Sequence, residues 1–144
     1  MIKKALTLLL LGGFAGIVTP GGAPGFAAAP DTEAVLKPVR TFTAGLGSHD
    51  FAAISSAWHA NGRLFIVENI QTVDFLKGIP PFVRFEFDEP EVLSVDGRIA
   101  VVKLGWRMIM PKTVGQHKSY LNLVEENGRW LIISETDFGV EKEP

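Results

Sequence analysis

The stretch Val83–Met110, VRFEFDEPEVLSVDGRIAVVKLGWRMIM, decides the fold. Apolar and charged residues alternate from Val83 to Asp88, which is typical of a strand with one buried face. Pro90 interrupts this strand and predicts a bulge or an exposed edge beside it. Asp96-Gly97 then predicts a two-residue hairpin turn, so the chain is expected to fold back as an antiparallel pair.

The return strand, Arg98–Met110, sorts its side chains into two faces. Its even-numbered positions are apolar, whereas its odd-numbered positions include Lys103 and Arg107. A regular hairpin would therefore place large apolar residues opposite one another and opposite charges across from each other. The expected pairs are Phe87 with Trp106, Phe85 with Met108, and Glu86 with Arg107.

A second hairpin is expected after a loop over residues 111–116. Its strands are His117–Glu125 and Arg129–Glu135, and Asn127-Gly128 is a strong signal for the turn between them. A regular pairing from this turn would place Leu123 opposite Ile132, Leu121 opposite Ser134, and Tyr120 opposite Glu135.

The segment before the sheet carries helical signals. Asp31 can cap a helix, and Gly45 and Gly47 mark its end. Pro38 lies either in the first turn of this helix or at a kink in a longer one. The residues expected to form its apolar face are Val35, Val39, Phe42 and Leu46.

Shorter elements connect this helix to the hairpins. Ser48 or Asp50 can cap a second, short helix, and Asn61-Gly62 predicts a turn. A strand is expected at Leu64–Val67 and a third helical turn at Thr72–Leu76.

Helices that precede hairpin-linked strands predict the α+β class with an antiparallel sheet. Because such a sheet twists and curls, helices on its concave side would leave a cavity at the open end.

Composition bounds the kind of protein. The chain has 144 residues, a formal net charge of -2 and no Cys. This length fits one domain, and the charge argues against a nucleic-acid partner. Disulfides, thiol nucleophiles and Cys-ligated metals are excluded.

Residues 1–27 have the build of a secretory signal peptide. Lys3 and Lys4 precede the uncharged segment Ala5–Val18, which is shorter than the about 20 residues needed to span a bilayer. Cleavage after Ala27 would leave one domain, residues 28–144, in the periplasm or secreted, with no stable membrane insertion. An uncleaved anchor is the alternative.

Five segments carry a resemblance to a known family: Ser94–Lys103, Ser119–Val124, Asn127–Ser134, Ser48–Phe51 and Trp58–Leu64. They resemble the nuclear transport factor 2-like superfamily, in particular the branch labelled SnoaL-like or lumazine-binding. The resemblance covers nearly all of residues 31–138 and is structural. It implies a cone of about three helices packed on the concave face of a curved antiparallel or mixed sheet, and a dimer through the outer face of the sheet.

Two departures from the pattern of that branch lower the expectation of catalysis. The position before Tyr120, often acidic in relatives, is Ser119, and a carboxylate is also missing at Asn61. The ligand named in the branch label is not carried over to this chain.

Asp74 and His59 are the candidate catalytic residues. Asp74 lies between Val73 and Phe75, and in a cavity wall its desolvated carboxylate would act as a general base. His59 comes at the entry to a strand, where an imidazole can exchange a proton near neutral pH. The plainer interpretations are a solvated helix face for Asp74 and a surface turn for His59. His117, beside a loop, is a weaker candidate of the same kind as His59, and its plainer interpretation is also a surface turn.

The candidate ligand-binding residues are large and mostly apolar. A curved sheet with these side chains on its inner face can line a hydrophobic cavity, although some of them must form plain core. Tyr120 can orient a ligand carbonyl or lie in the dimer surface. The candidates are Trp58, Phe85, Phe87, Trp106, Met108 and Tyr120.

No metal site and no cofactor are expected, because the three His are scattered and no phosphate-binding loop occurs. The leading hypothesis is an exported single-domain protein that binds a small apolar or aromatic molecule in the cone cavity or acts as an accessory protein, and a homodimer is expected separately. The alternatives are a cofactor-free isomerase, cyclase or dehydratase with Asp74 or His59 as general base, and a homodimeric interaction module without a ligand.

Overall fold

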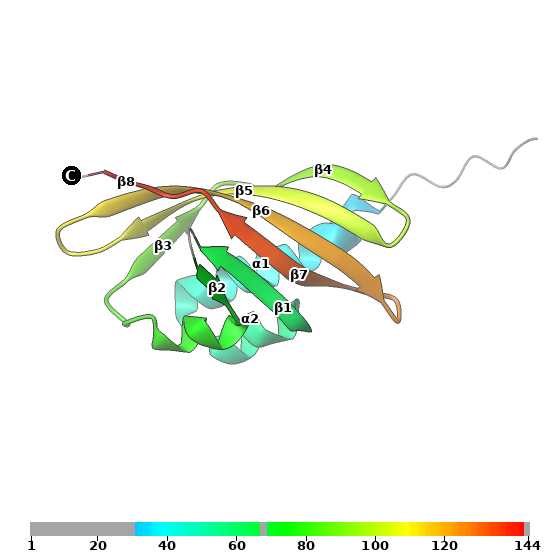
Figure 1. Ribbon diagram of the computed structural model, residues 1–144, viewed down its shortest axis with the longest axis horizontal. Helices are drawn as coiled ribbons and strands as arrows, with labels where there is room; N and C mark the ends of the chain where they lie inside the picture. Colours follow the sequence, from blue (N-terminus) through cyan, green and yellow to red (C-terminus); the bar gives the residue numbers. More distant parts are fainter. Residues whose placement is uncertain (1–30, 67–68, 143–144) are drawn as a thin grey trace, which may run out of the picture.

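The computed structural model describes residues 31–66 and 69–142. The expected signal peptide, residues 1–27, and Val67 of the expected strand lie outside the described residues. Two helices and a 3-10 turn pack against the concave side of a curved sheet, which confirms the α+β class (Figure 1).

Helix α1, Thr32–Ser48, is the longest helix and starts at the expected cap, where the Asp31 carboxylate accepts a hydrogen bond from the Ala34 amide at 3.2 Å. Pro38 lies buried inside the helix, so the longer of the two predicted helices forms. His49, with a φ of 56°, ends it in the left-handed conformation. All four residues of the predicted apolar face are buried.

Two short elements follow. Helix α2, Phe51–Ala57, is capped by Asp50, whose carboxylate accepts from the Ala53 amide at 3.1 Å. The predicted third helical turn is a 3-10 turn, η1, at Val73–Gly78. Within the described residues, no helix is long and apolar enough to cross a membrane.

The sheet is mixed, with eight strands in the described part of the chain. The order is β2-β1-β7-β6-β5-β3, with β4 also beside β5 and β8 beside β6. Only the β1–β7 pair among these is parallel. The strands are β1 (Trp58–Ile66), β2 (Asn69–Gln71), β3 (Arg84–Phe87), β4 (Glu91–Asp96), β5 (Ile99–Ile109), β6 (Val114–Glu126), β7 (Arg129–Asp137) and β8 (Val140–Lys142).

The turn predicted at Asn61-Gly62 is wrong, because both residues lie inside β1. The register of β1 against β7 shifts between Trp58 and Arg63, so a bulge occupies this place. A Cβ on Gly62 would lie 2.6 Å from Cε3 of Trp58. The glycine therefore lets the strand cross the buried Trp58 ring closely and does not form a turn.

The first hairpin has the predicted strand pairing, although its turn lies one residue later than predicted. Asp96 pairs with Ile99, so the turn is Gly97-Arg98, and of the two expected turn residues only Gly97 has a positive φ, 57°. The register shifts between Val92 and Ser94 and again before β3, and these shifts compensate for the displaced turn. The pairs Phe87–Trp106, Phe85–Met108 and Glu86–Arg107 are confirmed.

The second hairpin departs from its predicted pairing at one residue. Both Asn127 and Gly128 have a positive φ, and Leu123 pairs with Ile132 as expected. Beyond that pair, Ile133 is an extra residue in β7. The predicted pairs Leu121–Ser134 and Tyr120–Glu135 are wrong, since Leu121 pairs with Glu135 and Tyr120 with Thr136.

This bulge decides which side chains of β7 face the helices, because one extra residue reverses the faces of all later side chains in a strand. Glu135 and Asp137 face the same side as the buried Leu121, toward the helices. A regular β7 would have directed them outward.

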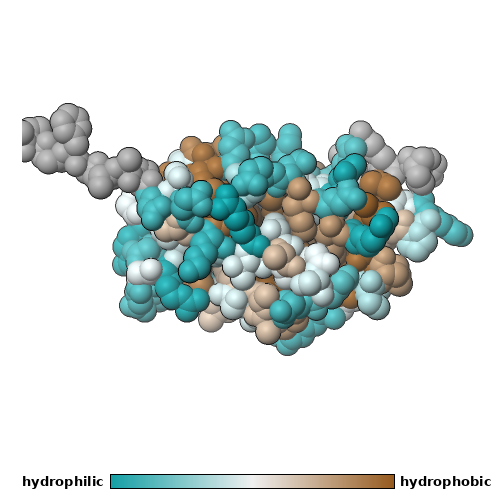
Figure 2. All heavy atoms as spheres, turned by 180° about the vertical axis from the view of Figure 1, so that it is seen from behind, coloured by the Kyte–Doolittle hydropathy of each residue, from teal (hydrophilic) through white to brown (hydrophobic). Residues whose placement is uncertain are grey.

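The core lies between α1 and the middle of β5, β6 and β7. Val35, Val39, Leu121, Leu123 and Ile132 are among its fully buried residues. Elsewhere hydrophobic side chains reach the surface in separate patches between hydrophilic ones, as Figure 2 shows for one face. The exposed large apolar residues are Phe65, Ile70, Phe75, Phe82, Leu93, Ile99 and Phe138.

Candidate functional site

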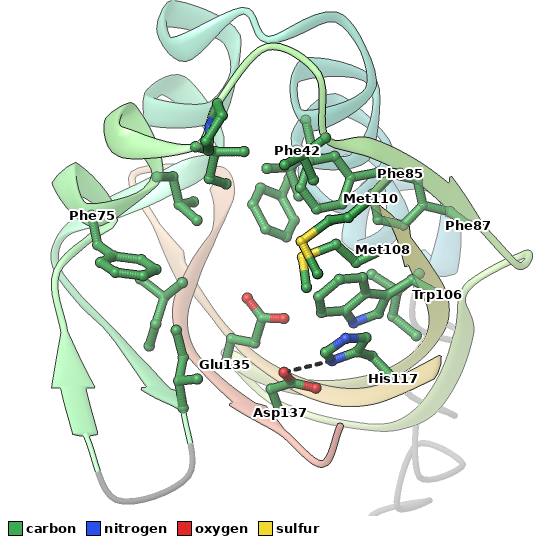
Figure 3. Close-up of a pocket in the computed structure, with 18 of the residues that line it drawn as sticks. Phe42, Phe75, Phe85, Phe87, Trp106, Met108, Met110, His117, Glu135 and Asp137 are labelled. Carbon is green, nitrogen blue, oxygen red and sulfur yellow. Dashed lines mark hydrogen bonds and ion pairs between the residues drawn. The ribbon is translucent and has the colours of Figure 1, made fainter. Parts of the chain in front are cut away.

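A cavity of about 340 Å³ occupies the end of the cone that the core does not fill. α1, η1, β1, β3 and β5 supply apolar walls, and the polar lining residues come from β6 and β7 (Figure 3). Phe75 and Phe82 line the cavity and are also about half exposed, so they lie at its rim.

The alternating side-chain directions of β5 and β3 explain why one wall of the cavity consists of large apolar side chains. The inner-face residues of β5 are small and buried at Ala100 and Val102 and large at Trp106 and Met108, and Met110 follows directly after the strand. Phe85 and Phe87 of the neighbouring strand extend this wall, with ring centroids 5.9 and 6.5 Å from that of Trp106.

Glu135 is the most unusual residue of the cavity. Its carboxylate points into the open interior (Figure 3), although the residue is only 6% exposed. Burial raises the pKa of this carboxyl group from its ordinary value of 4.5 to about 7, and the nearby Asp137 charge raises it as well. The Ser119 hydrogen bond and His117 act in the opposite direction. At neutral pH Glu135 is therefore able to give or take a proton.

A short hydrogen-bond chain holds Glu135 in place. The Trp106 Nε1–H donates to Ser119 Oγ at 2.9 Å, and Ser119 Oγ donates to Glu135 Oε1 at 2.7 Å. Ser119 is fully buried. Its hydroxyl thus links the Trp106 wall of the cavity to the Glu135 carboxylate.

His117 and Asp137 form a second polar unit at the edge of the cavity. Nδ1 of His117 lies 2.9 Å from Oδ2 of Asp137, and the two side chains are 11% and 10% exposed. The imidazole stacks on the Trp106 indole with ring centroids 3.8 Å apart. His117 Nε2 and Asp137 Oδ1 are buried and have no hydrogen-bond partner in the described part of the protein.

Four of the six candidate ligand-binding residues come together in the cavity lining: Phe85, Phe87, Trp106 and Met108. Trp58 instead packs in the core against Phe42, with ring centroids 5.5 Å apart. Tyr120 lies on the outer face of β6, where it contacts Phe138 edge to face at 6.0 Å.

The two candidate catalytic residues lie away from the cavity lining. The Asp74 side chain is 68% exposed and forms an ion pair with Lys77 at 2.9 Å. His59 lies on β1, with Nε2 3.5 Å from Glu126 Oε2 at the far end of the sheet.

The acidic residues of the cavity were not found from the sequence. Regular alternation placed Glu135 outward, and only the bulge at Ile133 turns it inward. A signal did exist for His117, which shares the odd-numbered positions of β6 with the inward Leu121 and Leu123. No group of three His, Cys, Asp or Glu with metal-binding geometry occurs within residues 31–66 and 69–142.

Comparisons with known proteins identify the fold. No protein-family profile and no curated protein sequence matches the chain. Among solved structures, a hexachlorocyclohexane dehydrochlorinase from Novosphingobium barchaimii superposes with a TM-score of 0.68 at 7% identity, over 78% of this chain and 90% of that one.

Two further structures show how varied the proteins with this fold are. An NTF2-like protein of unknown function from Shewanella baltica matches with a TM-score of 0.58 at 13% identity, over 76% of this chain and 93% of that one. The association domain of CaMKII from Caenorhabditis elegans matches with a TM-score of 0.60 at 14% identity, over 74% and 93%. This chain therefore has the fold of the nuclear transport factor 2-like superfamily, and the fold by itself does not select a function.

Proposed function

We propose that this protein binds a small, mostly apolar molecule in the cone cavity, with the one polar group of the ligand against Glu135. The observation that carries this proposal is a cavity of about 340 Å³ whose lining is apolar except for Glu135, Asp137 and His117 at one end. Ligand pockets typically combine an apolar body with a few convergent polar groups.

The size of the cavity limits the ligand. A cavity of about 150 Å³ already accommodates a benzene ring, so a volume of about 340 Å³ has room for a molecule with one or two rings. The aromatic and Met side chains of β3 and β5 favour a flat or aromatic body, since rings and thioethers pack well against one another.

A cavity-filling variant tests the proposal. A library of one- and two-ring compounds is expected to contain ligands that raise the melting temperature of the wild-type protein. Met108→Trp, which places a larger ring in the cavity, should abolish that increase. Ile109→Trp, one residue along β5 on the outer face, is the matched control and should keep it. If no compound binds, or if Met108→Trp binds as well as the control, the proposal fails.

A second candidate function is acid–base catalysis without a cofactor, as in an isomerase, cyclase or dehydratase. The observation that favours it is the Glu135 carboxyl group, whose pKa of about 7 suits a general base at neutral pH. Glu135 replaces Asp74 and His59 in this hypothesis, because neither of those side chains reaches the cavity lining.

Proton exchange tests the catalytic candidate directly. A small cyclic ketone that binds in the cavity is incubated with the protein in deuterated water, and exchange at the carbon beside the carbonyl is followed by NMR. Glu135→Gln should abolish the protein-dependent exchange because an amide cannot accept this proton, whereas Asp74→Asn should leave it unchanged. Exchange that persists in Glu135→Gln would remove Glu135 as the base.

We also propose that the chain is exported and cleaved after Ala27. The support is the order of charged, uncharged and small residues in the first 27 positions. Fractionation of expressing cells followed by intact-mass measurement checks this, and the expected species begins at Ala28. Full-length protein retained in the membrane fraction would contradict it.

A homodimer through the outer face of the sheet is the remaining proposal. Its support is the apolar character of that face at Tyr120, Phe138 and Ile99, of which the last two are exposed. Light scattering should give twice the monomer mass, and Tyr120→Arg should reduce it. A wild-type monomer at working concentration would refute the proposal.

A further inference from the structure

The cavity lining holds two carboxylates and no permanent positive charge. Its ionisable lining residues are Glu135, Asp137 and His117, and neither Lys nor Arg is among its lining residues. No ionisable side chain from α1, η1, β1, β3 or β5 lines the cavity. An anionic ligand would therefore meet carboxylates without a fixed counter-charge, which is strongly unfavourable in an apolar site.

Hydrogen-bond directions show that the polar end consists of acceptors. An indole N–H can only donate, so the Ser119 hydroxyl accepts from Trp106 and must use its own proton toward Glu135. Glu135 Oε1 is consequently an acceptor. The carboxylate has further lone pairs, and it points into the cavity (Figure 3).

The neighbouring pair adds acceptors and no free donor. When Asp137 is ionised, its Oδ2 accepts from Nδ1–H of His117, and Nε2 of the neutral ring is then an acceptor. Among the described residues at this end of the cavity, His117 Nε2 and Asp137 Oδ1 are buried without a hydrogen-bond partner. The polar end of the cavity is thus suited to a ligand group that donates hydrogen bonds.

The walls are aromatic as well. The cavity lining includes five Phe residues and Trp106, and an aromatic ring attracts a cation that lies over its face. This set consists of Phe42, Phe75, Phe82, Phe85, Phe87 and Trp106.

We propose that the ligand is an organic cation, namely a protonated amine on an apolar body of one or two rings, bound with its ammonium group against Glu135. This rests on the proposed function of the cavity and names its ligand class. An ammonium supplies three donors and one positive charge, which match the acceptors and the charge of the polar end. Its desolvation is offset only by pairing with the carboxylate, so the preference depends on Glu135.

Binding of a cation would also change the protonation of the site. A positive charge beside a carboxylate favours the ionised form, so the pKa of Glu135 would fall from about 7 when the amine binds. Protein near neutral pH should then release a fraction of a proton for each amine bound. A neutral ligand would not cause this release.

Three probes of one shape test the inference: 2-phenylethylamine, 2-phenylethanol and phenylacetate. Calorimetric titration near neutral pH should show the amine binding at least about tenfold more tightly than the alcohol, with no measurable binding of phenylacetate. Repeating the amine titration in two buffers of different ionisation enthalpy should reveal the released proton. Glu135→Gln, which keeps the size and the Ser119 contact, should reduce the preference for the amine by about tenfold; Glu86→Gln on the outer face is the control.

The outcomes separate this inference from the proposal on which it rests. Should the alcohol bind as tightly as the amine, or the amine preference survive in Glu135→Gln, the cation assignment is overturned while the apolar cavity remains a ligand site. Failure of every probe and of the wider library overturns both. If Glu135→Gln does not fold, the pH dependence of amine binding to the wild-type protein tests the cation assignment instead. The affinity for the amine must fall as Glu135 becomes protonated below about pH 7.

Discussion

The buried carboxylate of Glu135 should make the protein less stable as the pH rises, and Glu135→Gln should remove this effect. In the unfolded chain this group loses its proton near its ordinary pKa of 4.5, whereas in the folded protein it keeps the proton until about pH 7. Between these two pH values the folded state binds more protons than the unfolded state. The contribution of Glu135 to the free energy of unfolding is therefore complete at low pH and is lost as the pH approaches 7.

The size of the loss follows from the pKa difference. A shift from 4.5 to about 7, at about 1.4 kcal/mol for each pKa unit, corresponds to roughly 3 kcal/mol. Gln keeps the shape of the side chain and an oxygen for the Ser119 hydroxyl, but it cannot ionise. The stability of Glu135→Gln relative to the wild type should thus increase by about 3 kcal/mol between about pH 4 and pH 8.

Urea unfolding at several pH values measures this difference. Other carboxylates change the stability of both proteins equally, so subtracting the wild-type curve from the Glu135→Gln curve isolates one residue. Glu86→Gln, whose carboxylate is half exposed on the outer face beside Arg107, should show no comparable trend. A constant difference between Glu135→Gln and the wild type across this pH range would refute the reasoning, because Glu135 would then titrate alike in the folded and unfolded states.

Three further predictions concern packing, turn geometry and the hydrogen-bond chain. Gly45→Ala should destabilise the protein, since its Cβ would lie 2.9 Å from an isoleucine side chain of α2, whereas Gly47→Ala has open space and should be neutral or stabilising; thermal unfolding compares the two. Gly97→Ala should cost about 1 kcal/mol in urea unfolding because of its positive φ, and an unchanged stability would contradict the turn described above. Ser119→Ala should raise the pKa of Glu135 further, because the hydroxyl that lowers it is removed; NMR titration of the carboxyl carbon would show a lower value if this is wrong.

Local patterns were sufficient for most of the fold. The helix cap at Asp31 was predictable because a short acidic side chain before an apolar period satisfies free amides of the first turn, and Asp50 is one of the two candidate caps predicted for the second helix. The pairing of Phe87 with Trp106 was also correct, although it results from a displaced turn and compensating register shifts. Successive side chains of a strand point to opposite faces of the sheet. Two register shifts of one residue each therefore return the later side chains to the faces that the regular pattern predicts.

Local sequence patterns gave wrong predictions where the structure of a segment depends on its packing against other parts of the sheet. Asn61-Gly62 has the composition of a turn, but it lies in the bulge of β1 between Trp58 and Arg63, which both pair with β7, so the strand continues through it. Ile133 lies in the central strand β7, between β6 and β1, and the irregularities in both ladders meet there. Neither partner strand is visible from the local sequence of β7.

The sequence alone therefore determined which residues form the apolar inner face of β3 and β5, because alternation is a local property of the chain. The direction of Glu135 and Asp137 was decided only by tertiary structure, since one extra residue accommodated between two partner strands reverses the alternation beyond it. The acid of the candidate site thus depends on strand pairing and not on any motif.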